Sequence, residues 1–169
     1  MLILDKNKTY LEEIHISDTM TRNQLDKQQL DHLKQICDEA GIKLTHQRLE
    51  IFREMTAATD HPSAEVIHKR LRKKMPTVAI DTVYRTLATF DELGIVKKLH
   101  VMGERALFDA NLRRHHHFVC TRCKRVEDIY WPEFDESMLP EKAAKVGKIQ
   151  SRHLELHGIC KQCMAEEEK

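Results

Sequence analysis

Two cysteine pairs near the C-terminus are the residues of this chain most clearly suited to chemistry: Cys120-Thr121-Arg122-Cys123 and Cys160-Lys161-Gln162-Cys163. Each C-x-x-C turn brings two thiolates to one side of a tight loop, and two such turns complete a tetrahedral sulfur cage. The spacing therefore predicts a structural Zn²⁺ site made of all four cysteines. The alternative is a redox dithiol, as in a small thiol oxidoreductase, although that motif opens a helix after a strand.

A histidine cluster, His115-His116-His117, lies just before the first cysteine pair. His115 and His117 are two residues apart, so in a strand both side chains point to the same face. Histidine is the commonest metal ligand in proteins, and it titrates near neutral pH. A sulfur cage beside this cluster indicates two metals with different roles, one that holds the fold and one that exchanges.

Length and composition restrict the class of protein. A chain of 169 residues fits one domain or two small ones. Its five cysteines include an odd one, Cys37, which argues against a secreted disulfide framework. No signal-peptide pattern and no membrane-spanning apolar run are present, so we expect a cytoplasmic protein without a membrane partner, in a compartment where C-x-x-C favours metal. The net charge of +1 does not by itself indicate a nucleic-acid partner.

The elements that must position these residues begin with a polar N-terminal extension, residues 1–26. Helical periodicity then predicts four helices and a hairpin over residues 27–108. The first helix is predicted to end at Gly41 and the fourth at Gly94. Thr45 and Ser63 are the predicted N-caps of the second and third helices, and the fourth helix begins near Ile80. The predicted hairpin strands are Ile95–Val101 and Arg105–Phe108, joined by a turn at Met102–Glu104. Helices followed by a hairpin predict a winged helix-turn-helix.

The second half, residues 115–169, follows a polar hinge at residues 109–114. Its patterns predict a small α/β domain built on the cysteine cage. The expected elements are strands at His117–Val119 and Val126–Tyr130, a helix from Pro132 through about Val146, a strand at Ile149–Leu156 and a closing helix at Cys160–Glu168. The predicted fold class is therefore α+β.

Several segments between Gly41 and Cys163 occur in a characteristic order: Leu44-Thr45 with Gln47-Arg48, His61-Pro62-Ser63-Ala64-Glu65, Thr82-Val83-Tyr84-Arg85-Thr86-Leu87, Glu92-Leu93-Gly94, His115-His116-His117-Phe118-Val119-Cys120, and Leu154-Glu155-Leu156 with Gly158 before the last C-x-x-C. In this order and spacing they resemble the ferric uptake regulator (Fur) family of winged-helix metalloregulators. The resemblance implies a homodimeric, metal-dependent repressor that binds DNA. It assigns residues 27–108 to DNA binding and residues 115–169 to dimerisation around a structural zinc site.

The resemblance also implies which residues bind the regulatory metal and the DNA. The regulatory Fe²⁺ or Mn²⁺ ligands would be His61, Asp109, His115, His117 and Asp128. An ion bound to both halves would favour one relative orientation and thereby change DNA affinity. Contacts with double-stranded DNA would come from Lys43 in the minor groove and from Thr82, Tyr84 and Arg85 on a major-groove helix. A C₂ dimer would read an inverted repeat.

Two residues point to different branches of the family. Asp128 resembles the peroxide-responsive branch, which implies that hydrogen peroxide and Fe²⁺ would oxidise His61 or His115 and release the DNA. Arg85 resembles the iron-uptake branch, because peroxide sensors often have asparagine there. We favour peroxide sensing because the chemistry resides at the metal, and keep an iron-responsive or zinc-responsive uptake regulator as the alternative.

An enzyme is the competing class. A hydrolytic zinc site needs an open coordination position and a general base, but the sequence contains no H-E-x-x-H and no nucleophile motif. Many relatives have a further metal site, yet Arg152 stands at its histidine position and strand alternation directs His153 to the opposite face. A site from His116, Asp135 and His153 is therefore not expected, and His157 receives no assignment.

Overall fold

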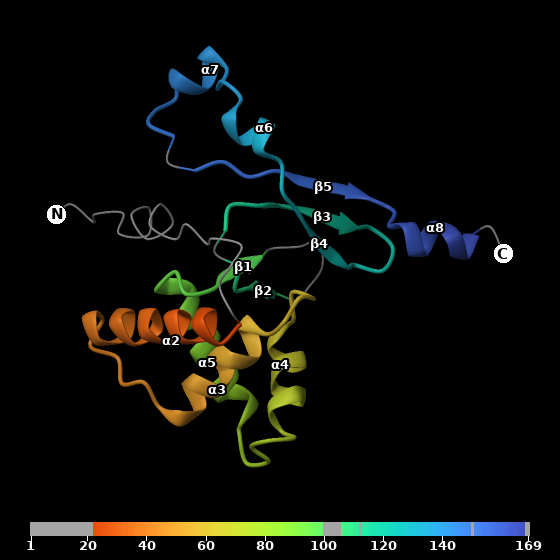
Figure 1. Ribbon diagram of the computed structural model, residues 1–169. Helices are drawn as coiled ribbons and strands as arrows, with labels where there is room; N and C mark the ends of the chain where they lie inside the picture. The colour runs from red at the N-terminus through yellow and green to blue at the C-terminus, as the bar shows by residue number, and fades with distance from the viewer. Residues whose placement is uncertain (1–21, 100–105, 112, 150, 168–169) are drawn as a thin grey trace. The chain divides into compact units, whose positions relative to one another are not determined.

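The computed structural model describes residues 22–99, 106–111, 113–149 and 151–167 (Figure 1). These residues form two compact units. The first contains residues 22–99 and 106–111, and the second contains residues 113–149 and 151–167. Most of the predicted extension and the predicted Met102–Glu104 turn lie outside the described residues. No helix in the described part of the chain is long and apolar enough to cross a membrane.

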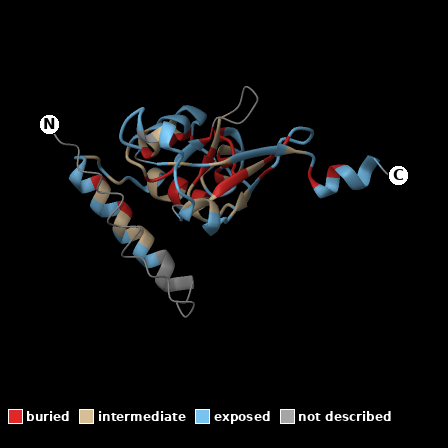
Figure 2. Cartoon of the chain, turned by 90° about the horizontal axis from the view of Figure 1, so that it is seen from above, coloured by how far each residue is buried: buried red, intermediate tan, exposed pale blue. Residues whose placement is uncertain are grey.

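Four helices build the first unit, as the sequence predicts: α2 (Arg22–Glu39), α3 (His46–Thr56), α4 (Ala64–Leu71) and α5 (Ile80–Glu92). The first of them begins at Arg22, within the extension predicted for residues 1–26. Thr45 caps α3, since its hydroxyl accepts a hydrogen bond from the Arg48 backbone nitrogen at 3.3 Å. Gly41 and Gly94 follow α2 and α5 with φ of +67° and +69°, the left-handed conformation that ends helices. The buried faces of the helices share one core, which includes Leu33, Ile51, Met55, Ile67, Leu71, Val83, Leu87 and Phe90 (Figure 2).

A short hairpin completes the first unit. Strands β1 (Lys97–Leu99) and β2 (Leu107–Asp109) pair antiparallel, with Lys98 opposite Phe108. Ile95, Val96 and Phe108 join the core of the helices, so the hairpin is packed against them. Helices followed by a packed hairpin form the predicted winged helix-turn-helix arrangement.

The second unit is built on a three-stranded sheet with the order β4-β3-β5. The central strand β3 (His116–Cys120) pairs antiparallel with β4 (Val126–Ile129) and parallel with β5 (Glu155–Gly158). Helix α8 (Lys161–Glu167) follows β5 after a short connection. The α+β class is confirmed.

Two predicted elements of the second unit are wrong. The single helix from Pro132 to about Val146 is replaced by α6 (Pro132–Glu136) and α7 (Glu141–Ala144). Pro140 explains the break, because proline cannot donate to the preceding helical turn and disfavours helical geometry in the residue before it. The predicted strand Ile149–Leu156 lies later, at Glu155–Gly158, where β3 supplies its hydrogen-bonding partner.

Candidate metal centres

The four predicted zinc ligands converge in the second unit. The sulfur atoms of Cys120, Cys123, Cys160 and Cys163 all lie within 4.8 Å of one another. The Cys120–Cys163 and Cys123–Cys160 sulfur distances are 3.9 and 3.7 Å. Four sulfurs at about 2.3 Å from a tetrahedral Zn²⁺ ion lie about 3.8 Å from each other, so the arrangement fits structural zinc.

Backbone contacts shape this sulfur cage. The Cys120 sulfur accepts hydrogen bonds from the backbone N–H groups of Cys123 and Cys160. These bonds, with that of Cys123 having the larger effect, lower the pKa of Cys120 to about 6. Burial, followed by hydrogen bonding with the neighbouring thiols, raises the pKa of Cys163 to about 12. Four thiolates so close together would repel one another, and a bound divalent cation would remove that repulsion.

The cage joins α8 to the sheet. Cys120, Cys160 and Cys163 are buried against Phe118, and they form the apolar cluster at this end of the unit. Polar contacts also reach α8: the Arg122 guanidinium donates to the Cys163 carbonyl at 2.9 Å and to Glu167 at 3.0 Å, and Arg125 donates to Gln162 at 2.9 Å. Most of α8 is exposed (Figure 2), and its one buried residue is Cys163. The sulfur cage is therefore the principal attachment of α8.

A second cluster of potential ligands lies on one face of β3 and β4. The His115 and His117 Nε2 atoms are 2.9 Å apart, and they lie 3.6 and 3.9 Å from Asp128 Oδ1. His117 and Asp128 are direct partners across the strand pair. Two ligands that are each about 2.1 Å from an ion lie about 3 Å apart at right angles and about 4.2 Å apart on opposite sides, so all three distances fit one small divalent cation.

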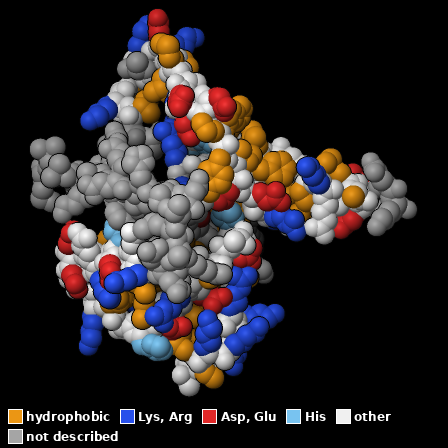
Figure 3. Space-filling view, in the orientation of Figure 1, with side chains coloured by type: hydrophobic (Ala, Val, Ile, Leu, Met, Phe, Trp, Pro, Cys, Tyr) orange, Lys and Arg blue, Asp and Glu red, His pale blue; other side chains and the backbone are white. Residues whose placement is uncertain are grey.

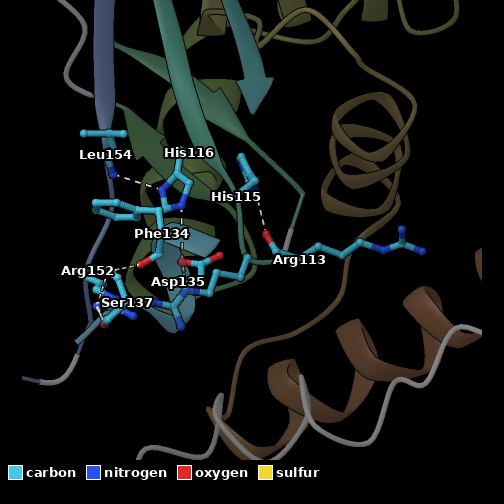
Figure 4. A network of polar contacts seen from close by, with 9 residues as sticks. Arg113, His115, His116, Phe134, Asp135, Ser137, Arg152 and Leu154 are labelled. Carbon is cyan, nitrogen blue, oxygen red and sulfur yellow. Dashed lines mark hydrogen bonds and ion pairs between the residues drawn. The ribbon is translucent and has the colours of Figure 1, made fainter. Parts of the chain in front are cut away.

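Two further contacts orient the histidine rings, and the sequence analysis missed both. His115 Nδ1 donates to the Arg113 carbonyl at 2.6 Å, which leaves Nε2 as the metal-binding nitrogen (Figure 4). On the opposite face of β3, His116 Nδ1 accepts from the Leu154 backbone at 3.1 Å, and its Nε2 is 3.3 Å from Asp135. A backbone carbonyl has no signature in the sequence, so no pattern could have identified the Arg113 contact.

The structure brings His116 and Asp135 together as a pair. Arg114 Nε lies 2.7 Å from the same Asp135 oxygen, so an arginine already neutralises that carboxylate. Among the described residues, neither His116 nor Asp135 belongs to a cluster of three or more potential ligands, and His153 is exposed. His157, left unassigned by the sequence, pairs with Glu155 at 2.7 Å.

The first unit contains the other two predicted ligands, His61 and Asp109. Both are buried, with His61 Nε2 4.0 Å from Asp109 Oδ1. His61 has a φ of +46°, a left-handed conformation that non-glycine residues rarely adopt. A buried imidazole held in this conformation beside a carboxylate is typical of a functional site.

Comparison with known proteins identifies the family. The model of the ferric uptake regulator family matches residues 39–159. The chain belongs to the ferric uptake regulator family. The peroxide-responsive repressor PerR of Staphylococcus epidermidis is 33% identical over 130 residues, which cover 76% of this chain and 85% of that repressor.

Solved structures of the ferric uptake regulator family have the same fold. The Vibrio cholerae ferric uptake regulator is 30% identical, with a TM-score of 0.63 over 75% of this chain and 98% of its own. A zinc uptake regulator in complex with zinc and DNA is 27% identical, with a TM-score of 0.57 over 85% of this chain and 98% of its own. The chain is thus a metal-responsive DNA-binding regulator and not an enzyme, which excludes the hydrolase and oxidoreductase alternatives.

The predicted DNA-contacting residues of this ferric uptake regulator family member lie in the first unit. Helix α5 exposes Tyr84 and Arg85, whereas Thr82 is half-buried. Lys43 is exposed before α3, and its carbonyl accepts from Arg48 at 2.6 Å. Arg85 pairs with Asp81 at 2.7 Å, one helical turn earlier. Further Lys and Arg side chains lie on the face of this helical unit that Figure 3 shows, among acidic ones.

Proposed function

We propose that this protein is a metal-dependent transcriptional repressor that senses hydrogen peroxide. The single observation that carries the proposal is the pair of histidine Nε2 atoms, 2.9 Å apart, facing Asp128 across β3 and β4. The two nitrogens and one carboxylate oxygen suit Fe²⁺ or Mn²⁺, and they contain no sulfur that would favour zinc or copper(I). The similarity to the Staphylococcus epidermidis peroxide-responsive repressor supports this reading.

The proposed regulatory ligand set is drawn from both units, with His61 and Asp109 from the first and His115, His117 and Asp128 from the second. A metal that binds all five favours the conformation in which they meet, so occupancy shifts the population toward that form. The proposed domains are residues 27–108 for DNA binding, residues 109–114 as the hinge and residues 115–169 for dimerisation.

The proposed sensing step is oxidation of His61 or His115. Bound Fe²⁺ would activate hydrogen peroxide. One peroxide oxygen is added to an imidazole ring carbon and the other leaves as water. The oxidised ring is a poorer ligand, so the metal is lost and the DNA is released.

DNA binding is proposed to use a homodimer, with α5 of each protomer in a major groove of an inverted repeat. Tyr84, Arg85 and Thr82 would contact the major groove, and Lys43 the minor groove. The DNA complex of the similar zinc uptake regulator supports this use of the fold. The proposed working compartment is the cytoplasm, where thiolates stay reduced.

Peroxide treatment followed by peptide mass spectrometry tests the proposed function. We expect protein loaded anaerobically with Fe²⁺ and given near-stoichiometric hydrogen peroxide to gain one oxygen on His61 or His115. It should then release a DNA duplex that was selected from a random pool by the metal-loaded protein. Protein loaded with Mn²⁺ is the control, and its histidines should remain unmodified.

The alternatives make different predictions in the same experiment. An iron-responsive uptake regulator would bind DNA with Fe²⁺ but keep unmodified histidines and its DNA after peroxide. A zinc-responsive regulator would bind the duplex with added Zn²⁺ and would not respond to Fe²⁺ or Mn²⁺. Either result would reject the peroxide sensor while leaving the fold and the sulfur cage unaffected.

Arg85→Ala is expected to weaken binding of the selected duplex by about 5- to 150-fold, because a bidentate arginine–guanine contact contributes about 1–3 kcal/mol. Selection from a random pool should show relaxed base preference at one position of each half-site. Arg72→Ala, which removes an exposed arginine beyond α4, is the control and should leave that preference intact. Unchanged base preference with Arg85→Ala would show that this side chain does not read the sequence.

A further inference from the structure

Glu65, in the first turn of α4, joins two segments of the first unit. Its Oε2 accepts a hydrogen bond from the Ser63 hydroxyl at 2.6 Å, and its Oε1 accepts one from the Tyr84 phenol at 2.6 Å. Hydrogen bonds to a carboxylate are shorter and stronger than those between neutral groups. One side chain thus connects the segment before α4 to the exposed face of α5.

The Ser63 end of this connection adjoins His61. Ser63 forms an isolated antiparallel bridge with Leu107, and the Phe108 backbone nitrogen donates to the Pro62 carbonyl at 3.1 Å. These contacts align residues 61–63 with β2, whose last residue is Asp109. A shift of His61 or Asp109 would therefore be transmitted to Ser63 through these backbone contacts.

The Tyr84 end lies on the helix proposed to enter the DNA. Tyr84 is 45% exposed and next to Arg85 on the outer face of α5. Its hydroxyl is the only polar atom of the side chain. The bond to Glu65 holds this hydroxyl against the first turn of α4.

Ser63 does not make the N-cap hydrogen bond that its position before α4 would allow. It occupies the predicted N-cap position of α4, but its side chain makes no cap hydrogen bond. A serine N-cap ordinarily accepts from a backbone N–H in the first turn, whereas here the hydroxyl donates to Glu65. Departures of this kind from local preference are expected at functional sites.

We propose that Glu65 is a positioning residue that transmits the state of the His61 and Asp109 segment to Tyr84 and so couples metal occupancy to DNA affinity. This inference rests on the proposed function, because it requires His61 and Asp109 to bind the regulatory metal. The hydrogen-bonded chain from Ser63 through Glu65 to Tyr84 gives the coupling a continuous path within one unit. Coupling between two sites typically changes affinity by about 5- to 150-fold.

Duplex affinity measured with Mn²⁺ and after removal of the exchangeable metal tests the proposal. For each variant the readout is the ratio of the two dissociation constants, with zinc content checked in parallel. We expect Glu65→Ala to reduce this ratio at least about fivefold while changing the metal-free dissociation constant less than about twofold. Glu65→Gln, which keeps one acceptor oxygen, should have a ratio between those of the Glu65→Ala and wild-type proteins.

Two further variants separate coupling from a change in charge or a direct DNA contact. Glu92→Ala removes an exposed carboxylate at the far end of α5 and should leave the ratio unchanged. Glu65→Ala combined with Tyr84→Phe should reduce the ratio no further than the stronger single change, since both break one chain.

Three outcomes would count against the inference. A wild-type ratio in Glu65→Ala protein would overturn the coupling role alone. An equal change in metal-loaded and metal-free affinity would also overturn it, because Glu65 would then act on DNA directly. A wild-type protein whose DNA affinity does not respond to Mn²⁺ or Fe²⁺ would overturn the proposed function and this inference together.

Discussion

Protein carrying Cys163→Ser will lose its tightly held zinc, and its second unit will unfold. Cys163 is buried in the sulfur cage, and a serine hydroxyl is a much poorer zinc ligand than a thiolate. Structural zinc contributes about 10–16 kcal/mol in small domains, comparable with the whole net stability of a typical domain. We expect zinc measured by mass spectrometry to fall from about one ion per chain to less than about 0.1.

The same substitution should also affect assembly. Circular dichroism should show loss of ordered β structure, and sedimentation should show loss of the dimer, since the second unit carries the proposed dimerisation surface. Cys37→Ala is the matched control. Cys37 is buried in the first unit, away from the four clustered sulfurs, so its removal should lower stability by about 1–2 kcal/mol and leave zinc in place. Tight zinc binding by the Cys163→Ser protein would contradict the structural role of the cage.

His117→Ala is expected to abolish metal-dependent DNA binding. The Nε2 atom of His117 lies 2.9 Å from that of His115, and His117 is the cross-strand partner of Asp128. Loss of a residue that merely orients a ligand already reduces metal affinity about 10- to 100-fold, so loss of the ligand itself should weaken Mn²⁺ binding more than about 100-fold. Calorimetry measures this affinity, and duplex binding with Mn²⁺ should equal that of the metal-free protein.

His157→Ala is the control for this experiment. His157 lies on β5 of the same sheet and pairs with Glu155, so its loss removes an imidazole without touching the cluster. Zinc content should stay at the wild-type value in both variants, because neither residue contributes to the sulfur cage. If His117→Ala bound Mn²⁺ with wild-type affinity, the regulatory site would have to lie elsewhere.

The first unit was predictable because its signals are local. Helix ends depend on the conformational freedom of Gly41 and Gly94, and one helix start depends on the Thr45 hydroxyl, all of which act within one turn. The apolar spacing that marks each helix also defines the face that enters the core. Local preference and tertiary packing agree there, so the predicted helices are confirmed.

Prediction failed in the second unit where an element depends on a distant partner. Pro132 suggested the start of one helix through about Val146, but Pro140 interrupts it and leaves two short helices. The last strand lies at Glu155–Gly158 instead of Ile149–Leu156, because only that stretch meets β3 in parallel register. A strand needs a neighbour to satisfy its backbone, and the sequence does not show which stretch has one.

The sequence by itself determined the family resemblance, the four sulfur ligands and the shared face of His115 and His117. These depend on residue type and short spacing, which backbone geometry converts directly into position. Only the tertiary structure decided that Asp128 faces His117, that Arg113 orients His115, and that Glu65 joins Ser63 to Tyr84. Those contacts depend on strand register and helix packing, which arise from the folded chain as a whole and leave no pattern along the sequence.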